Sequence, residues 1–425
     1  MRFLPLLLSL FLIPSGANAL DTAYKTLLKQ ITPEQMEEIS ASVPAPGEAV
    51  DVKALDDNAR YWVTVSASNS KERTALLEQG LDIIEVGKDT VSGFALADTV
   101  QSVYAKGLVK SFRAIGKDEG RDFPAKDAAY HNYAETAAIL KELATKNPDI
   151  ASVFSVGKTT EGRDIWCLRL NSSVKGNGKS TKPGAFFLGN HHAREHISNE
   201  VPLLFAAWLM DNRRDSEIKK YLDTLDIFII PMLNPDGVEY DIKDGRYQMY
   251  RKNMSKNSDG SFGTDLNRNY DFLWCKYGSS HTPRYDTYCG KAAFSEPESQ
   301  AMRKFFADHT NIKTHISYHS YGEMILYPYG GTDDEVDSEQ DKKAFVRIGN
   351  EMAKMTNYRN MKSSDLYVSS GDSCDWAYKE HKTLAFTFEL DGYNFYPAAS
   401  QIDSIVSKNI KAAKYLLSQT ANPYK

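Results

Sequence analysis

The 425-residue sequence has few cysteines, little excess charge and almost no long apolar runs, and each shortage excludes a class of protein. Four cysteines are too few to form the covalent framework of a chain of this size, so we expect one local disulfide. A formal net charge of −5 leaves no basic excess for phosphates, which argues against nucleic acid or an anionic membrane as the partner. The length and a hydrophobic content of 42% predict two folded domains.

Residues 1–19 are typical of a secretory signal peptide. Arg2 precedes an apolar stretch from Phe3 to Ile13, and Ala17-Asn18-Ala19 is a small-x-small cleavage motif. The apolar stretch is shorter than the roughly 20 residues that a membrane-spanning helix requires. We therefore expect a secreted protein that begins at Leu20 and has no membrane-spanning segment.

Residues 20–115 have the pattern of a small α+β domain with a ferredoxin-like order of elements, β-α-β-β-α-β. Strands are expected at 61–65, 81–86, 91–96 and 109–114, with helical stretches around 74–77 and 100–105. The charged stretch 116–122 lacks apolar residues and contains Lys117 and Arg121. Such a composition is typical of an exposed linker that a protease can cut.

From residue 123 to residue 425, helical and strand-like stretches alternate, which predicts an α/β fold with a mixed central β-sheet flanked by helices. The expected strands are Ile165–Leu170, Ala185–Leu188, Ile227–Ile230, Thr314–Tyr318, Met324–Leu326 and Leu384–Glu389. The expected helices are Tyr133–Ala144, Ser198–Met210, Glu296–Ala307 and Ile402–Leu417.

His192 and Glu195 follow the expected strand at 185–188, and a helix is expected after them. In the first turn of a helix, side chains three residues apart can face one point, and imidazole with carboxylate suits zinc. The same spacing also arises by chance in solvated loops, so a metal site needs a third ligand. His319 ends another expected strand, where open α/β sheets bind ligands, although a lone histidine there is more often a packed core or rim residue.

Seven separated motifs then occur in one order. They are HxxE with an intervening arginine, Tyr-Arg-Lys-Asn, Asp-Leu-Asn-Arg-Asn, His-Ser-Tyr, Tyr-Pro-Tyr-Gly, Gly-Asp-Ser-Cys-Asp-Trp and Phe-Thr-Phe-Glu. On these motifs, the chain from Phe123 to its C-terminus resembles the carboxypeptidase A/B family of zinc metallocarboxypeptidases. The resemblance implies a zymogen with a pro-segment at 20–115, an activation linker at 116–122 and a catalytic domain at 123–425. Its expected activity is removal of single residues from the C-terminus of peptides.

The resemblance further implies that His192, Glu195 and His319 bind one zinc ion, the His₂Glu set known from carboxypeptidase A. Asp265 matches the carboxylate that holds the first ligand histidine from its other side, although an Asp at this point could also simply form a turn. His191 and His196 flank the motif without matching it, and we expect them to be packing or rim residues.

The catalytic roles are implied in the same way. Glu389 resembles the general base that carries a proton from the attacking water to the leaving amine, and Arg251 resembles the residue that stabilises the oxyanion. Recognition of the substrate's free carboxylate suits the planar fork of arginine. The residues that match this substrate-binding role are Arg194, Asn267, Arg268 and Tyr367.

The four cysteines receive three different interpretations. Cys275 and Cys289 align with a disulfide of the family, whereas Cys167 lies in an apolar strand and is expected to be an inert core thiol. Cys374, seven residues after Tyr367, occupies the pocket position that is acidic in family members preferring Lys or Arg and apolar in those preferring hydrophobic residues.

Asp372 lies two residues earlier, on what we expect to be a pocket-lining loop. As a pocket residue it would pair with a basic substrate side chain, while Leu326, Leu366 and Thr387 would provide an apolar wall, and the specificity would be broad. As a turn residue that points to solvent it would leave a pocket for hydrophobic residues alone.

Two other functions remain open at this point: a hydrolase of the same fold that acts on another amide, and an inactive relative that binds peptides. The filled carboxylate-binding positions favour ordinary peptides, and the filled catalytic positions favour an enzyme. We expect a monomer whose partners are peptide or protein substrates with a free C-terminus and an activating protease.

Overall fold

The computed structural model describes residues 52, 55–56, 60–114, 123 and 127–425. The expected signal peptide and activation linker lie outside these residues. Residues 56–425 cluster as one unit, and this unit contains a four-stranded and an eight-stranded sheet. Among the described residues, none of the helices has the length and apolar character needed to cross a membrane.

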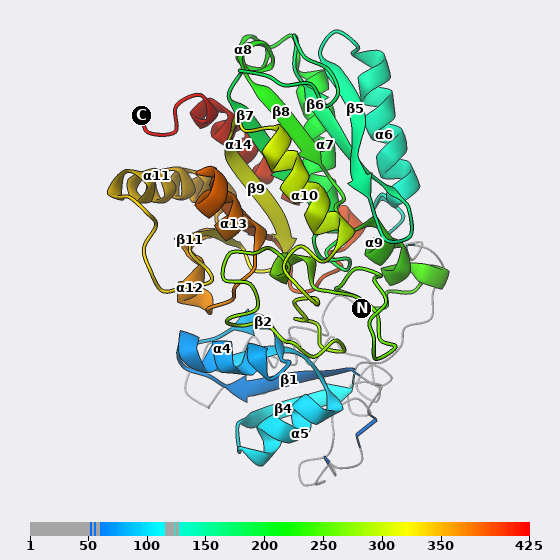
Figure 1. The fold of residues 1–425 in the computed structure, drawn as a ribbon, viewed down its shortest axis with the longest axis vertical. Coiled ribbons are helices and arrows are strands. Elements are labelled where there is room, and N and C mark those ends of the chain that lie inside the picture. The colour runs from blue at the N-terminus through cyan, green and yellow to red at the C-terminus, as the bar shows by residue number, and fades with distance from the viewer. Residues whose placement is uncertain (1–51, 53–54, 57–59, 115–122, 124–126) are drawn as a thin grey trace, which may run out of the picture. The chain divides into compact units, whose positions relative to one another are not determined.

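The four-stranded sheet confirms the expected α+β order (Figure 1). Its elements are β1 (Arg60–Ser66), α4 (Ser70–Glu78), β2 (Asp82–Val86), β3 (Thr90–Leu96), α5 (Ala97–Ala105) and β4 (Val109–Ala114). The strands are antiparallel in the order β2-β3-β1-β4. Buried and partly exposed residues alternate along β1, so one face of this sheet packs into a core, as a period of two requires.

The eight-stranded sheet is mixed, as the sequence predicts. Its strands are β5 (Ala151–Lys158), β6 (Asp164–Leu170), β7 (Gly184–Leu188), β8 (Asp226–Ile230), β9 (Ile312–Ser320), β10 (Met324–Tyr327), β11 (Arg359–Lys362) and β12 (Leu384–Leu390). They lie in the order β11-β10-β12-β9-β7-β8-β6-β5. The central strands β12, β9, β7 and β8 are parallel to one another, so their carboxyl ends share one edge of the sheet.

Helices cover both faces of this sheet, in the arrangement that Figure 1 shows. They are α6 (Tyr133–Lys146), α7 (Ile197–Asp211), α8 (Ser216–Thr224), α9 (Pro235–Asp241), α10 (Pro297–Asp308), α11 (Glu339–Thr356), α12 (Ser363–Leu366), α13 (Ser373–His381) and α14 (Ile402–Thr420). Short 3₁₀ turns lie at η3 (Lys243–Gly245), η4 (Leu266–Arg268) and η5 (Ala399–Gln401).

Alternate side chains of strand β7 pack into the two separate cores on opposite faces of the eight-stranded sheet. Ala185 and Phe187 belong to the core cluster that includes α7, α11 and α14, whereas Phe186 and Leu188 belong to the cluster that includes α10 and α13. All five residues of β7 are buried, as expected for a central strand that is covered on both faces.

Several elements were not expected from the sequence, namely β5, β11, α8, α9, α11, α12 and α13. Strand β5 is an edge strand with mostly half-buried residues, so it lacks a continuous apolar run. Helix α11 does carry a signal, because Ala344, Phe345, Ile348 and Met352 are buried at helical spacing. That periodicity was sufficient to predict it.

Candidate active site

The carboxyl ends of β7, β9 and β12 carry the residues of the candidate site. In the parallel register of β12 and β9, Glu389 lies beside His319. In the register of β7 and β9, Leu188 lies beside Ser317, so the segment that follows β7 emerges next to the end of β9. Strand pairing therefore brings together residues that are far apart in the sequence.

A tight turn follows β7 and presents His192 and Glu195. A side chain at Gly189 would place its Cβ 2.1 Å from the carbonyl oxygen of Ser198, so only glycine fits there. Asn190 has a φ of 49°, and its side-chain amide donates to the carbonyl oxygens of His192 and Glu195, both at 3.1 Å. This hydrogen bonding holds the turn in one conformation.

The helix expected after His192 and Glu195 is present, and the two residues precede it rather than forming its first turn. Helix α7 begins at Ile197, and the pair lies in the turn before it, where the amide of Glu195 donates to the carbonyl oxygen of His192 at 3.3 Å. An i to i+3 turn brings side chains three apart onto one side just as a helical turn does. The side chains of His192 and Glu195 therefore face one point because of this turn and not because of a helical turn.

His192, Glu195 and His319 have ligand atoms that all lie within 4.8 Å of one another, and all three side chains are buried. Nδ1 of His192 is 2.7 Å from Oε1 of Glu195, and Nδ1 of His319 is 3.0 Å from Oε2 of the same carboxylate. The two Nδ1 atoms face each other at 3.1 Å. Two imidazole nitrogens and one carboxylate that converge in this way suit one zinc ion and leave a coordination position open.

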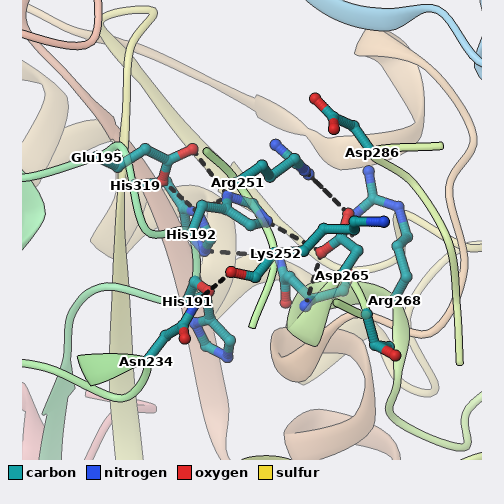
Figure 2. Close-up of polar contacts among 12 residues, drawn as sticks. His191, His192, Glu195, Asn234, Arg251, Lys252, Asp265, Arg268, Asp286 and His319 are labelled. Carbon is teal, nitrogen blue, oxygen red and sulfur yellow. Dashed lines mark hydrogen bonds and ion pairs between the residues drawn. The ribbon is translucent and has the colours of Figure 1, made fainter. Parts of the chain in front are cut away.

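Asp265 lies on the other side of His192, as the motif predicts. Its Oδ1 is 3.1 Å from Nε2 of His192, and its Oδ2 accepts hydrogen bonds from Nε and Nη2 of Arg251 at 3.0 and 2.9 Å (Figure 2). Against the effect of burial, Arg251 and His192 hold the pKa of Asp265 well below its ordinary value. The Asp265 carboxylate is thus placed to orient both the histidine and the arginine.

The flanking histidines have partners of their own. His191 is buried, with Nε2 at 3.0 Å from the hydroxyl of Tyr270 and Nδ1 at 3.1 Å from the hydroxyl of Ser317. Nε2 of His196 is 2.8 Å from Oδ2 of Asp241. These contacts agree with the expectation that both residues pack rather than bind the metal.

A cavity of about 340 Å³ opens over this group. The residues singled out in the sequence that line it are His192, Glu195, Arg251, Asn267, Arg268, His319, Tyr367, Asp372 and Glu389. Leu326, Leu366 and Thr387 line it as well.

Burial, followed by the negative charge of Glu195, raises the pKa of Glu389 well above its ordinary value. Burial also raises the pKa of Tyr367 to about 12.

Arg268 is oriented at the cavity by the backbone around it. Its Nη1 donates to the carbonyl oxygen of Asn267 at 2.8 Å, and its Nε donates to the carbonyl oxygen of Gly278 at 3.4 Å. The side chain of Asn267 spans the site, because its Nδ2 is 3.5 Å from Nε2 of His319 while its Oδ1 accepts the amide of Ser373 at 3.0 Å. Both residues belong to η4.

Asp372 lies at the end of the expected pocket-lining loop, whereas Cys374 lies in the first turn of helix α13. Asp372 is the N-cap of α13, where its Oδ1 accepts the amides of Cys374 and Asp375 at 3.0 and 2.9 Å. Its Oδ2 is buried and has no hydrogen-bond donor among the described residues. The Sγ of Cys374 accepts a hydrogen bond from Thr387 at 3.3 Å, and this residue packs in the core rather than lining the cavity.

The four-stranded sheet contributes residues to the same cavity, which the sequence analysis did not anticipate. Ile83, Ile84, Glu85 and Val86 of β2 line it, and Val86 packs against the cluster of Met324, Leu326 and Leu366. The signal in the sequence was a pair of carboxylates, Asp82 and Glu85, in the otherwise apolar stretch 81–86.

Asp82 is buried and forms an ion pair with Arg194. Its Oδ1 also lies 3.5 Å from Nη1 of Arg251. Although burial opposes the effect, Arg194 and Arg251 lower the pKa of Asp82. Arg194 is fully buried, and its Nη1 is 3.2 Å from Oδ2 of Asp286.

The disulfide and the core thiol Cys167 are found as expected. Cys275 and Cys289 form a disulfide in the loop that precedes α10, with their Cα atoms 5.7 Å apart. Cys167 and Cys374 are buried free thiols. Burial raises the pKa of Cys167, which agrees with an inert thiol.

Comparison with curated proteins finds relatives along most of the chain. A zinc carboxypeptidase of Saccharothrix mutabilis subsp. capreolus is 34% identical over 385 residues, which cover 83% of this chain and 87% of the relative. Carboxypeptidase B of Bos taurus is 35% identical and covers 68% of this chain, with 70% of its own length matched. Carboxypeptidase A1 of Homo sapiens is 33% identical, and the match covers 70% of this chain and 72% of that protein.

Solved structures show the same fold. Carboxypeptidase A from Helicoverpa armigera superposes with a TM-score of 0.70 at 24% identity and covers 87% of this chain and 98% of its own. Thrombin activatable fibrinolysis inhibitor superposes with a TM-score of 0.69 at 25% identity, and the match covers 85% of this chain and 99% of that protein's chain.

The family described as zinc carboxypeptidase matches residues 136–412, the stretch that supplies all three candidate zinc ligands together with Arg251, Arg268 and Glu389. Together with the identities above, this match shows that the chain belongs to the zinc carboxypeptidase family and is a zinc-dependent exopeptidase.

Proposed function

We propose that this chain is a secreted precursor of a zinc carboxypeptidase that releases both large apolar residues and Lys or Arg from the C-terminus of peptides. The observation that carries the specificity is the place of Asp372, a carboxylate that borders the substrate cavity and has an oxygen without a donor among the described residues. Leu326 and Leu366 supply the apolar part of the same cavity. A pocket with an apolar wall and one anion accepts both side-chain classes.

The catalytic roles belong to the same proposal. When zinc is bound, it supplies Lewis-acid polarisation of the scissile carbonyl and lowers the pKa of water. Glu389 takes the proton of the attacking water and passes it to the leaving amine, for which a raised pKa is suitable. Arg251, held by Asp265, presents positive charge where the oxyanion forms.

The substrate's terminal carboxylate is bound by Arg268 and Asn267, with Tyr367 closing over it. All three line the cavity beside Glu389. Arg194 is engaged by Asp82 in the precursor, so a role for Arg194 in binding the substrate requires that the four-stranded sheet leave first.

Latency follows from the same contacts. Residues of β2 line the cavity, and Asp82 neutralises Arg194 and approaches Arg251, so a peptide cannot use either arginine in the precursor. We therefore assign residues 20–115 as an inhibitory pro-segment and 116–122 as the linker that an activating protease cuts. Residues 1–19 direct the chain to export, where the disulfide of Cys275 and Cys289 persists.

Peptides that differ only in the last residue test the specificity, with the zinc-loaded full chain after limited trypsin treatment. Wild type is expected to release Phe, Leu, Lys and Arg. Asp372→Asn retains a capping oxygen for α13 but removes the charge, and is expected to lower kcat/KM for Lys and Arg by at least about tenfold while sparing Phe and Leu. Asp365→Asn, an exposed carboxylate of α12 that does not line the cavity, is the control. If Asp372→Asn lowers kcat/KM equally for all four C-terminal residues, or if wild type does not release Lys and Arg, the pocket is purely hydrophobic and Asp372 does not select basic residues.

A further inference from the structure

Asp375, which the proposed function does not use, is a second buried carboxyl group directly behind Asp372. It lies in the first turn of α13 and is 1% exposed. Its carboxylate oxygens accept the amide of Gly330, both at 2.9 Å, and Oδ2 accepts the amide of Gly331 at 2.8 Å. Gly330 also lines the cavity, and a Cβ built on it would lie 3.7 Å from Oδ2 of Asp372. The two carboxyl groups therefore adjoin the same short backbone segment.

Two carboxylates that are buried side by side cannot both carry a full charge at neutral pH. Burial, followed by the charge of Asp372 and a side-chain hydrogen bond with it, raises the pKa of Asp375 well above its ordinary value. Burial likewise raises the pKa of Asp372. One proton retained by the pair also relieves the cost of the Asp372 oxygen that otherwise lacks a donor.

The titratable and charged groups that face the pair keep one charge state while the pair titrates. Arg268 of η4 faces Asp372 and places a guanidinium group beside the pair. Burial raises the pKa values of Tyr270, Tyr329 and Cys374, so these three groups stay neutral. A change of charge at this part of the cavity wall is therefore a change of the Asp372–Asp375 pair.

We propose that Asp375 is a second specificity-determining residue, because it shares one proton with Asp372 and a basic C-terminal side chain displaces that proton when it binds. The inference rests on the proposed role of Asp372 in accepting Lys and Arg. The free pair carries one negative charge; when the substrate guanidinium enters, the proton leaves to solvent and two negative charges face the cation. Asp375 acts through Asp372 and is a positioning residue, not a catalytic one.

The ratio of kcat/KM for a peptide ending in arginine to that for the same peptide ending in citrulline isolates this effect. The two side chains have nearly the same shape and differ in charge, and the arginine charge is constant. Zinc, Glu389 and the carboxylate-binding residues act equally on both peptides, so their titrations cancel in the ratio.

The wild-type protein is used as the zinc-loaded full chain after trypsin treatment. We expect its arginine-to-citrulline ratio of kcat/KM to rise by at least about tenfold from pH 6 to pH 9, because a cation next to a carboxyl group lowers the pKa of that carboxyl group by roughly 1–3 units. Asp375→Asn keeps an acceptor for the Gly330 and Gly331 amides but has no second proton to lose. Its ratio is expected to be flat over this range and still higher than that of Asp372→Asn. Asp365→Asn is expected to follow wild type.

A flat ratio in wild type that nevertheless cleaves arginine through Asp372 would overturn the role of Asp375 and leave the proposed specificity standing. A wild type that cleaves no arginine peptide at any pH would remove the proposed specificity itself. If Asp375→Asn does not fold, calorimetry on wild type decides the matter. Free arginine should release about one proton on binding near neutral pH and citrulline none, as measured in buffers of different ionisation enthalpy. Equal proton release by both would contradict the inference.

Discussion

Asp82 in β2 forms a buried ion pair with Arg194, which lies in the turn between the zinc-ligand candidates His192 and Glu195. The partners are 112 residues apart in the sequence. The same carboxylate faces Arg251 at 3.5 Å. One residue of the four-stranded sheet thus engages two arginines of the candidate site.

The intact chain is expected to be nearly inactive on short peptides, because residues of β2 line the cavity and Asp82 engages Arg194 and Arg251. Limited trypsin treatment should raise activity sharply, and sequencing of the new N-terminus should place the cut after Lys117 or Arg121. Arg113, at the end of the expected strand, is a less favourable site. Full activity of the uncut chain would mean that the pro-segment does not inhibit the enzyme and only assists folding.

Asp82→Asn should raise the residual activity of the uncut chain about tenfold or more, because loss of one partner of a buried ion pair costs several kcal/mol and weakens the closed state. Asp89→Asn makes the same change of charge at an exposed position, in the turn between β2 and β3, and should have no effect. Activity is measured before trypsin and again after it. After cleavage, wild type, Asp82→Asn and Asp89→Asn should have equal activity. A difference that persists would mean that Asp82 does not act through latency.

Glu389→Gln should bind zinc as wild type does but lose about 10²–10⁴-fold in kcat/KM, the usual contribution of a general base. Zinc content is measured by atomic absorption and turnover on a peptide ending in phenylalanine. Glu380→Gln, an exposed glutamate of α13, is the matched control. A chelator should abolish activity in wild type and added zinc should restore it. Near wild-type turnover by Glu389→Gln would assign the base to another group.

His131 contributes a pH-dependent part of the stability. Its Nδ1 is 2.7 Å from Oε2 of the buried Glu200, and this hydrogen bond raises the pKa of His131. A group whose pKa is raised by folding stabilises the fold below its ordinary pKa, and this contribution is lost as pH rises through the raised value. His131→Gln should therefore lower the free energy of unfolding by about 1–2 kcal/mol at pH 5.5 and by less at pH 9. The exposed His281→Gln should show no such difference; a constant loss for His131→Gln would mean that only packing is involved.

Arg169 and Asp226 form a fully buried pair between β6 and β8, with two hydrogen bonds of 2.7 Å. Asp226→Asn should lower the free energy of unfolding by about 3–5 kcal/mol, because it leaves a buried guanidinium without its counter-charge. Asp223→Asn, at an exposed position of α8, should change it by less than about 0.5 kcal/mol. Denaturant unfolding of the zinc-loaded proteins measures both values, and equal stability of the two variants would contradict the assigned importance of the pair.

Much of the fold was predictable because its central strands are short apolar runs with turn residues at their ends. β7, β8 and β12 fall within one or two residues of the expected ranges. The edge strands β5 and β11 were missed because an edge strand is half solvated and its side chains need not be apolar. Helix α13 was missed because Asp372 was interpreted only as a possible pocket or turn residue, although Asp is a favoured N-cap.

From the sequence by itself, the resemblance of its motifs to a zinc metallocarboxypeptidase family implied the zinc ligands and the carboxylate-binding candidates. Apolar periodicity, a local property of the chain, predicted the small α+β domain followed by a mixed β-sheet. Only the tertiary structure decided which side chains meet across long separations: Glu389 with His319 through strand register, Asp82 with Arg194, and Asp372 with both the cavity and Asp375. These contacts depend on how the strands pair and on which distant segments the fold brings together. A carboxylate acquires its charge state and its function from neighbours that no local pattern in the sequence identifies.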